Sequence, residues 1–206
     1  PVQSHLSENK SEIQWVHKLV PESKCYADAY AKFGLWGNTP TIMAHCTWSK
    51  EKDRSFMDNP NIFIAHCPDS NANLTSGVAA AKYFLDNGNK IGLGSDIAAG
   101  TSLYITRAIA DSIKASKLRQ RLMNEDNSTL TFPEAFYMAS VGGGEFFGNV
   151  GTFSQGFDAD IIVLDESGLD STLTCEFTIE ERLERYCYLA GERPVTHKFV
   201  KGRFLF

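Results

Sequence analysis

The chain has 206 residues, of which 43% are apolar, and it carries 20 Lys and Arg against 25 Asp and Glu, for a formal net charge of -5. This length suits one large domain, or one and a half smaller ones, with a substantial core. The acidic balance offers no basic surface to a phosphate backbone, so nucleic acid is excluded as an expected partner. No apolar run reaches the roughly 18 residues of a membrane-spanning helix, so we expect no membrane association.

The five cysteines are scattered along the chain and form no C-x-x-C pair. They predict neither a disulfide framework nor a zinc ribbon, and we expect reduced thiols that pack as small apolar groups. The amino terminus shows no signal peptide, which together with the thiols favours a cytoplasmic location. The sequence begins at Pro1, without an initiator Met, in a strand-like segment, so we expect it to be part of a longer chain.

The first two thirds of the sequence alternate short apolar strands with longer helical stretches. Strands are expected at residues 2–4, 41–44, 62–65 and 90–94. Helices are expected at residues 9–20, 24–33, 49–57, 76–87, 102–123 and 133–140. Buried strands separated by helices predict an α/β fold with a parallel sheet and right-handed crossovers.

The pattern changes near residue 150, where a small β unit is predicted. Strands are expected at residues 151–153 and 160–164, and a hairpin at residues 197–206. Between them, Thr178 and Glu181 form the pattern of a capping box for a helix that ends near Leu189. We therefore place a domain boundary between residues 1–148 and residues 149–206.

Each of the four predicted parallel strands is followed by one titratable side chain, in the order His5, His45, His66 and Asp96. The carboxyl ends of parallel strands lie at one edge of a sheet, where ligands bind in α/β folds. A single His after a strand is usually a core residue, but four such groups in succession favour a shared site. The two remaining histidines are expected on the surface, at His17 and His197.

Imidazoles together with a carboxylate are ligands that suit Zn²⁺ or Fe²⁺, and such an ion makes water a nucleophile at neutral pH. Glu8 is placed to carry protons between water and substrate, although an acid there also suits a helix N-terminus. Asp96 can likewise be an N-cap, but residues 97–100 separate it from the next helix. The polar segment 66–71 serves either as a turn or as support for the site.

Four segments of the chain occur in the order and spacing of the amidohydrolase superfamily. They are His5-Leu6-Ser7-Glu8-Asn9, Met43-Ala44-His45-Cys46, the segment Ile-Ala-His-Cys-Pro-Asp-Ser-Asn at 64–71, and Gly92-Leu93-Gly94-Ser95-Asp96. Within that superfamily the chain resembles the guanine deaminases, through the form of its first motif and its closing helix and hairpin. Residues 151–164 are similar to the segment in which these enzymes re-enter a small β-sandwich domain.

The resemblance implies a (β/α)8 TIM-type barrel, of which residues 1–148 form strands five to eight, followed in residues 149–206 by part of the β-sandwich domain. A full barrel takes about 250 residues, so we expect this chain to be the carboxyl-terminal half of a longer enzyme. The family's His-x-His metal ligands and its guanine-binding Arg-Phe pair and Gln belong to the other half. We expect the isolated chain to bind zinc weakly and to be inactive.

The resemblance also implies a role for each residue that matches a family motif. His5 would be a metal ligand, Glu8 the proton shuttle, and His45 a neighbour of the activated water. Asp96 would both bind the metal and accept the proton of the water. Glu8, His45 and Asp96 would also contact the substrate. The implied reaction is hydrolysis of guanine to xanthine and ammonia with one Zn²⁺, or Fe²⁺, per site, in a homodimer.

Two alternatives to this interpretation stay open. The first is another amidohydrolase, a deaminase or a chlorohydrolase that acts on a different aminated heterocycle. The second is a barrel-derived binding protein that has lost catalysis. The presence of Glu8, His45 and Asp96 disfavours the second alternative, because polar groups without a function are expected to drift.

Overall fold

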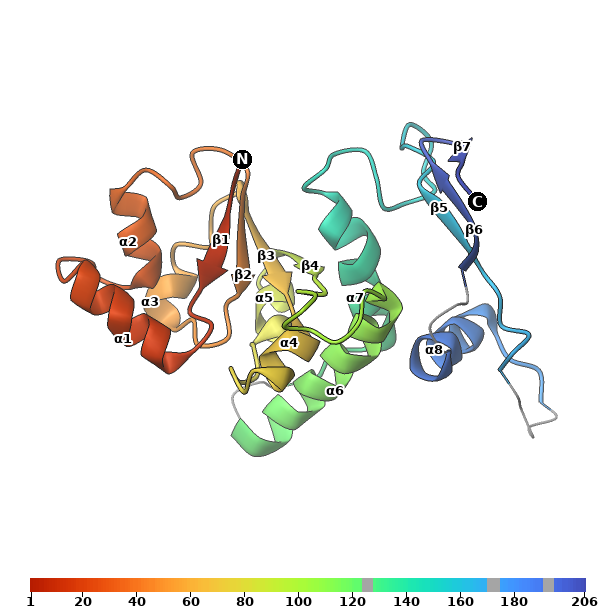
Figure 1. Cartoon of the computed structure of the whole chain (residues 1–206), viewed down its shortest axis with the longest axis horizontal. Coiled ribbons are helices and arrows are strands. Elements are labelled where there is room, and N and C mark those ends of the chain that lie inside the picture. Colours follow the sequence, from red (N-terminus) through yellow and green to blue (C-terminus); the bar gives the residue numbers. More distant parts are fainter. Residues whose placement is uncertain (124–127, 170–174, 191–194) are drawn as a thin grey trace.

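The computed structural model describes residues 1–123, 128–169, 175–190 and 195–206. Two sheets organise these residues: a parallel sheet in the order β1-β2-β3-β4 and an antiparallel sheet in the order β5-β6-β7 (Figure 1). The parallel strands are β1 (Val2–Leu6), β2 (Thr41–His45), β3 (Ile62–His66) and β4 (Lys90–Leu93). The predicted α/β class and its parallel sheet are therefore confirmed.

Helices connect the parallel strands and follow the last of them. They are α1 (Lys10–Leu19), α2 (Tyr26–Lys32), α3 (Glu51–Arg54), α4 (Pro68–Asn73), α5 (Ala81–Asp86), α6 (Ile105–Met123) and α7 (Phe132–Tyr137), which runs into the π-helix η1 (Met138–Gly142). Asn9 caps α1 in a capping box with Glu12, so this helix begins where the sequence predicts. Among the described residues, no helix is long and apolar enough to cross a membrane.

The register of the parallel sheet divides its side chains between two faces. His5 pairs with Ala44, Ala44 with Ala65 and Ala65 with Gly92, so these residues share one face. The opposite face carries Met43, Ile64 and Ile91, which are buried in one apolar cluster with helical residues such as Phe84 and Ile109. The helices α5 and α6 therefore pack on the face that carries Met43, and His5 belongs to the other face, which η1 approaches at Gly92.

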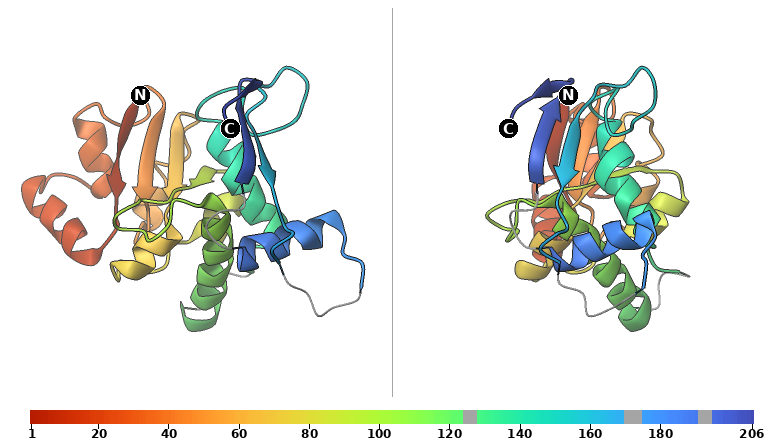
Figure 2. Two further views of the ribbon diagram at one scale, coloured as in Figure 1. Left: turned by 45° about the vertical axis from the view of Figure 1, so that its right-hand side comes forward. Right: turned by 90° about the vertical axis from the view of Figure 1, so that its right-hand side faces the viewer.

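The α7–η1 segment lies between the two sheets, as the two views of Figure 2 show together with Figure 1. It approaches the sheet closely at Gly92, where an added Cβ atom would lie 2.7 Å from the Cα atom of Gly143. A side chain at Gly92 would push η1 off β4. The helix predicted at 133–140 is thus confirmed, and η1 extends it to Gly142.

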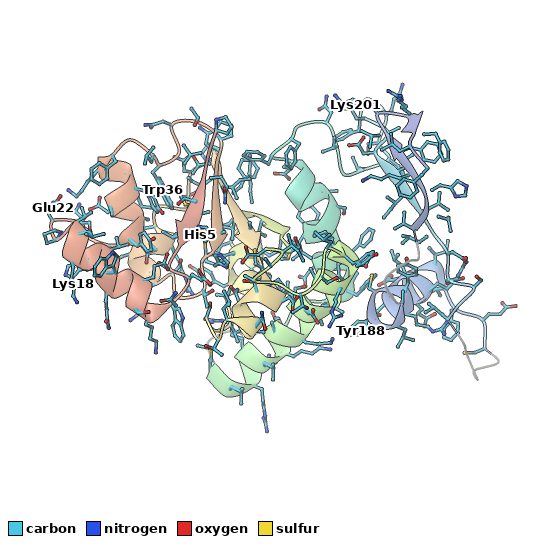
Figure 3. All side chains as sticks on the ribbon, viewed as in Figure 1. His5, Lys18, Glu22, Trp36, Tyr188 and Lys201 are labelled. Atoms are coloured by element: carbon cyan, nitrogen blue, oxygen red, sulfur yellow. The ribbon has the colours of Figure 1, made fainter. Side chains whose placement is uncertain are left out.

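The antiparallel sheet consists of β5 (Ile161–Leu164), β6 (Val195–Val200) and β7 (Arg203–Phe204). Between β5 and β6 lies α8 (Ile179–Leu189), whose capping box on Thr178 is present as predicted. On α8, the ring of Tyr188 faces the Lys114 ammonium of α6, 5.6 Å from its centroid; Figure 3 labels Tyr188, and also Lys201 at the turn between β6 and β7.

Three expectations from the sequence are wrong. The helix expected at residues 76–87 begins only at Ala81. Residues 151–153 form turns rather than a strand, because Gly151 has φ 94° and packs against η1, where an added Cβ would lie 2.5 Å from the Ser140 carbonyl oxygen. The polar segment after His66 is not a loop but the helix α4, which has Pro68 in its first turn.

Candidate active site

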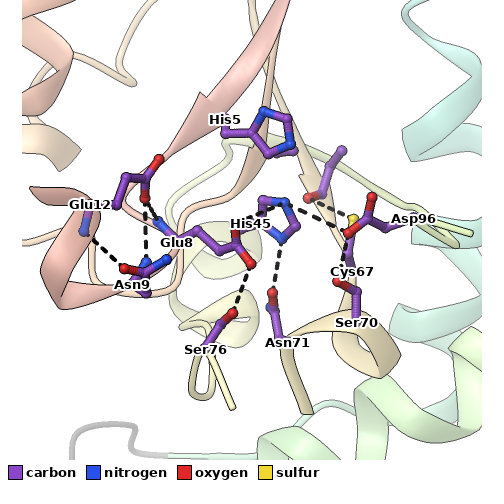
Figure 4. Close-up of polar contacts among 12 residues, drawn as sticks. His5, Glu8, Asn9, Glu12, His45, Cys67, Ser70, Asn71, Ser76 and Asp96 are labelled. Carbon is purple, nitrogen blue, oxygen red and sulfur yellow. Dashed lines mark hydrogen bonds and ion pairs between the residues drawn. The ribbon is translucent and has the colours of Figure 1, made fainter. Parts of the chain in front are cut away.

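His5 and His45 meet at the carboxyl ends of β1 and β2 (Figure 4). Their rings stack with centroids 5.2 Å apart and planes inclined by 18°. Regular alternation would place the two side chains on opposite faces, because His45 pairs with Leu6 and not with His5. His45 has a left-handed backbone with φ 70°, so the regular strand geometry ends at this residue and its ring reaches the face of His5.

Two carboxylates flank the inner nitrogen of His45. Its Nε2 atom lies 3.8 Å from Glu8 Oε2 and 3.9 Å from Asp96 Oδ2. Both distances exceed a hydrogen bond, and Nε2 is buried with no hydrogen-bond partner among the described residues. His45 is only 1% exposed, whereas Glu8 and Asp96 are partly open to solvent. The three groups therefore lie close together, with one buried and unpaired ring nitrogen between two carboxylates.

Each group of this cluster is held by a further side chain. Ser76 Oγ donates to Glu8 Oε1 at 2.7 Å, and Ser70 Oγ donates to Asp96 Oδ2 at 2.5 Å. His45 Nδ1 lies 2.9 Å from Asn71 Oδ1, within hydrogen-bonding distance. The backbone also helps, since the Glu8 N–H donates to the Glu12 carboxylate at 2.7 Å.

The structure thus brings His5, Glu8, His45 and Asp96 together at one edge of the sheet, as the strand-end pattern predicts. Ser70 and Asn71, for which the sequence allows either a turn or support of the site, contact the site. Ser76 also contacts it, although the sequence places this residue only at the start of a helix. No signal in the sequence indicates its hydrogen bond to Glu8, which joins residues far apart along the chain.

His66 does not join this cluster. It continues the regular geometry of β3 and is 2% exposed, with both ring nitrogens lacking a hydrogen-bond partner among the described residues. Burial, helped by the nearby His45, lowers the pKa of His66 to about 4. The ring is therefore neutral at physiological pH and packs as a core residue.

Cys67 lies beside the site but is not a nucleophile. Burial, together with the negative charges of Asp96 and Glu8, raises the pKa of its thiol to about 12. The thiolate is the reactive form of cysteine, and almost none of it is present near neutral pH.

The donor set fits part of a site for Zn²⁺ or Fe²⁺. His5 and Asp96 supply an imidazole and a carboxylate, and the unpaired Nε2 of His45 lies next to them. Within the described ranges, no three His, Cys, Asp or Glu side chains are grouped so that they could hold a metal ion. These residues therefore fit as a fraction of a coordination sphere and need further ligands to complete it.

Comparison with known proteins identifies close likenesses over the whole chain. The model of the amidohydrolase family matches residues 1–205. Guanine deaminase of Dictyostelium discoideum is 38% identical over 98% of this chain and 45% of its own length. Guanine deaminase of Escherichia coli K12 is 30% identical over 100% of this chain and 46% of its own length.

Among solved structures, the crystal structure of guanine deaminase from C. acetobutylicum with guanine bound in its active site superimposes with a TM-score of 0.93. It is 42% identical, and the match covers 100% of this chain and 48% of that protein. This chain therefore spans about half the length of the relatives that it matches.

Proposed function

We propose that this chain, which belongs to the amidohydrolase family, supplies the proton-transfer half of a guanine deaminase active site. The reaction is hydrolysis of guanine to xanthine and ammonia. The observation that carries the proposal is the likeness, over the entire chain, to a guanine deaminase crystallised with guanine. The convergence of Glu8, His45 and Asp96 on one space supplies the chemistry that such a reaction needs.

In this proposal, β1 to β4 are strands five to eight of a (β/α)8 barrel. Their parallel order and the meeting of His5, His45 and Asp96 at their carboxyl ends support this assignment. Residues 1–148 then form half of the barrel, and residues 149–206 belong to a small β-sandwich domain. The homodimer and the cytoplasmic location remain predictions.

His5 and Asp96 would hold one divalent cation, Zn²⁺ or Fe²⁺, together with ligands from outside this chain. When bound, such an ion lowers the pKa of water toward neutrality and so makes it a nucleophile. Asp96 already accepts a hydrogen bond from Ser70, which fixes one carboxylate oxygen and leaves the other available to a ligand.

Water attacks the ring carbon of guanine that bears the exocyclic amino group, and Asp96 accepts the proton that the water loses. Glu8, in its acid form, protonates the adjacent ring nitrogen, and a second proton delivered to the amino group lets it leave as ammonia. His45 lies beside the attacking water and the oxygen that forms at this carbon. The carboxylates of Glu8 and Asp96 lie only 3.8 Å and 3.9 Å from Nε2 of His45, so protons travel only short paths.

A chimera tests the proposal, because this chain and its relative are so similar. This chain would replace the matching segment of the C. acetobutylicum guanine deaminase, and ammonia release would be measured on guanine, adenine, cytosine and melamine. We expect turnover of guanine above all other substrates. A folded chimera, shown by circular dichroism and metal content, that turns over another heterocycle in preference to guanine would overturn the proposal. That outcome would favour the alternative of an amidohydrolase for a different substrate.

A further inference from the structure

The helix α4 carries four polar side chains with partners outside the helix, and all four partners belong to the site or to the loop that follows β4. Asn71 Oδ1 lies 2.9 Å from His45 Nδ1, and Ser70 donates to Asp96. Asp69 accepts from both the backbone N–H and the hydroxyl of Thr101, at 2.5 and 2.7 Å. Asn73 donates to the Ala99 carbonyl at 2.7 Å.

The loop that receives these contacts has a strained backbone. Asp96 and Ala98 adopt φ angles of 46° and 87°, in the left-handed region that costs non-glycine residues about 1 kcal/mol or more each. The loop also turns so tightly that an added Cβ on Gly100 would lie 2.0 Å from the Ser95 carbonyl oxygen. Such a loop keeps its conformation only if its surroundings hold it, and Asp69, Ser70 and Asn73 are in contact with it at both ends.

Asn71 acts on His45 in a different way. The two carboxylates beside Nε2 attract a proton to that nitrogen, whereas Asn71 Oδ1 attracts it to Nδ1. A neutral imidazole has one N–H, so the two sides of the ring compete for it. The buried contact between Nδ1 and Asn71 Oδ1, at 2.9 Å, is within hydrogen-bonding distance. Both carboxylates lie too far from Nε2 to form a hydrogen bond with it.

We propose that α4 is the positioning element of the site: Asn71 fixes His45 as the Nδ1–H tautomer, and Asp69, Ser70 and Asn73 hold the Asp96 loop. Nε2 then carries a lone pair directed into the space between Glu8 and Asp96, where it accepts a hydrogen bond from water. The functional meaning of this tautomer rests on the proposed function, whereas the tautomer itself does not. These four residues are positioning residues, since their side chains act through His45 and Asp96.

The tautomer of His45 can be read directly by ¹⁵N NMR of the histidine rings in the 206-residue chain, treated with chelator and held at a pH where the ring is neutral. A His45→Gln variant assigns the signals. We expect the wild-type chain to show the proton on Nδ1. A proton on Nε2 in the wild-type chain would overturn the proposal without any variant having to fold.

Substitutions at position 71 sharpen the test. Asn71→Leu removes the acceptor at similar volume, so the proton is expected to move to Nε2, beside the two carboxylates. Asn71→Asp keeps an oxygen acceptor and is expected to restore the wild-type tautomer. Asn87→Leu serves as the matched control, because Asn87 is exposed and bonds only within its own helix region, to the Tyr83 carbonyl. An Nδ1–H signal that persists in Asn71→Leu would contradict the role of Asn71.

Amide hydrogen exchange tests the loop contacts. The Thr101 N–H is expected to be protected in the wild-type chain and to lose at least tenfold protection in Asp69→Ala, while the core amides of β3 keep theirs. Equal protection of Thr101 in both proteins would show that α4 does not hold the loop. None of these readouts depends on turnover of guanine, so a failure here is distinguishable from a failure of the proposed function.

Discussion

The two sheets of this molecule differ in how deeply they bury apolar side chains of the same type. Ile64, in the middle of β3, is 3% exposed, whereas Ile162 of β5 is 48% exposed. The parallel sheet is buried under its helices and carries the side chains of the site at one edge, while the antiparallel sheet leaves much of its apolar surface open (Figures 1 and 3). A site whose groups must stay within a fraction of an ångström belongs on the sheet with the tighter packing.

The largest expected effect is the loss of guanine turnover when a residue of the site on the parallel sheet is replaced. In the chimera, Glu8→Gln is expected to lower guanine turnover by roughly 10²- to 10⁴-fold, the usual contribution of a general acid, while metal content stays nearly intact. Asp96→Ala is expected to abolish both turnover and metal binding, because it removes a ligand as well as a base. His197→Gln, on the exposed β6, serves as the control and should change neither. Unchanged turnover in Glu8→Gln would remove Glu8 from the mechanism.

The next largest effect is on the unfolding free energy. A matched pair of substitutions compares how tightly the two sheets are packed. Ile64→Ala removes a buried side chain from β3 and is expected to cost about 2–5 kcal/mol of unfolding free energy. Ile162→Ala removes a half-exposed side chain from β5 and is expected to cost less than about 1 kcal/mol, since part of its apolar surface is already in water. Urea unfolding followed by circular dichroism measures both. Equal losses would mean that β5 is buried in solution as deeply as β3.

A third comparison uses pH and two histidines, the buried His66 and the exposed His197. Folding lowers the pKa of His66 from its ordinary value of 6.5 to about 4, because the ring is buried. Between these values the unfolded chain binds a proton that the folded chain does not. The unfolding free energy therefore falls as the pH falls through this window, by roughly 3 kcal/mol in total.

His66→Asn should remove this contribution, so the stability of the variant should depend less on pH between about 6.5 and 4 than that of the wild type. His197→Asn, on the exposed sheet, should leave the wild-type dependence unchanged. Parallel curves for the wild type and His66→Asn would show that His66 is not buried as a neutral ring.

These histidines also show how far the sequence predicts the site. The strand ends could be placed from apolar runs alone, and with them His5, His45 and Asp96, because parallel strands share a direction. The sequence does not predict which of His45 and His66 belongs to the site. Both follow an alanine at the end of a strand, yet His45 leaves the regular strand at φ 70° and His66 does not. That difference arises from tertiary contacts, and no local pattern carries it.

The same limit applies to α4 and to residues 151–153. Pro, Asp, Ser and Asn are typical of turns, so the segment after His66 reads as a loop until the partners of Asp69 and Asn71 are known. Gly151 reads as part of a strand until its close approach to η1 is seen. In each case a contact between distant segments decides the local structure. The capping boxes of α1 and α8 are local, and the sequence predicts the one on Thr178.

The smallest expected effect comes from the two helix caps, one in each region. Asn9→Ala and Thr178→Ala each remove the oxygen that accepts from the third residue of its helix, and each should cost about 1 kcal/mol of unfolding free energy. Only Asn9 adjoins the site, because Glu12 of the same capping box also accepts from the Glu8 N–H at 2.7 Å. Loosening the first turn of α1 therefore shifts Glu8, and guanine turnover in the chimera should fall several-fold in Asn9→Ala but not in Thr178→Ala. If both variants lost stability equally and kept full turnover, the start of α1 would hold Glu8 no better than a surface loop, and Ser76 alone would fix its carboxylate.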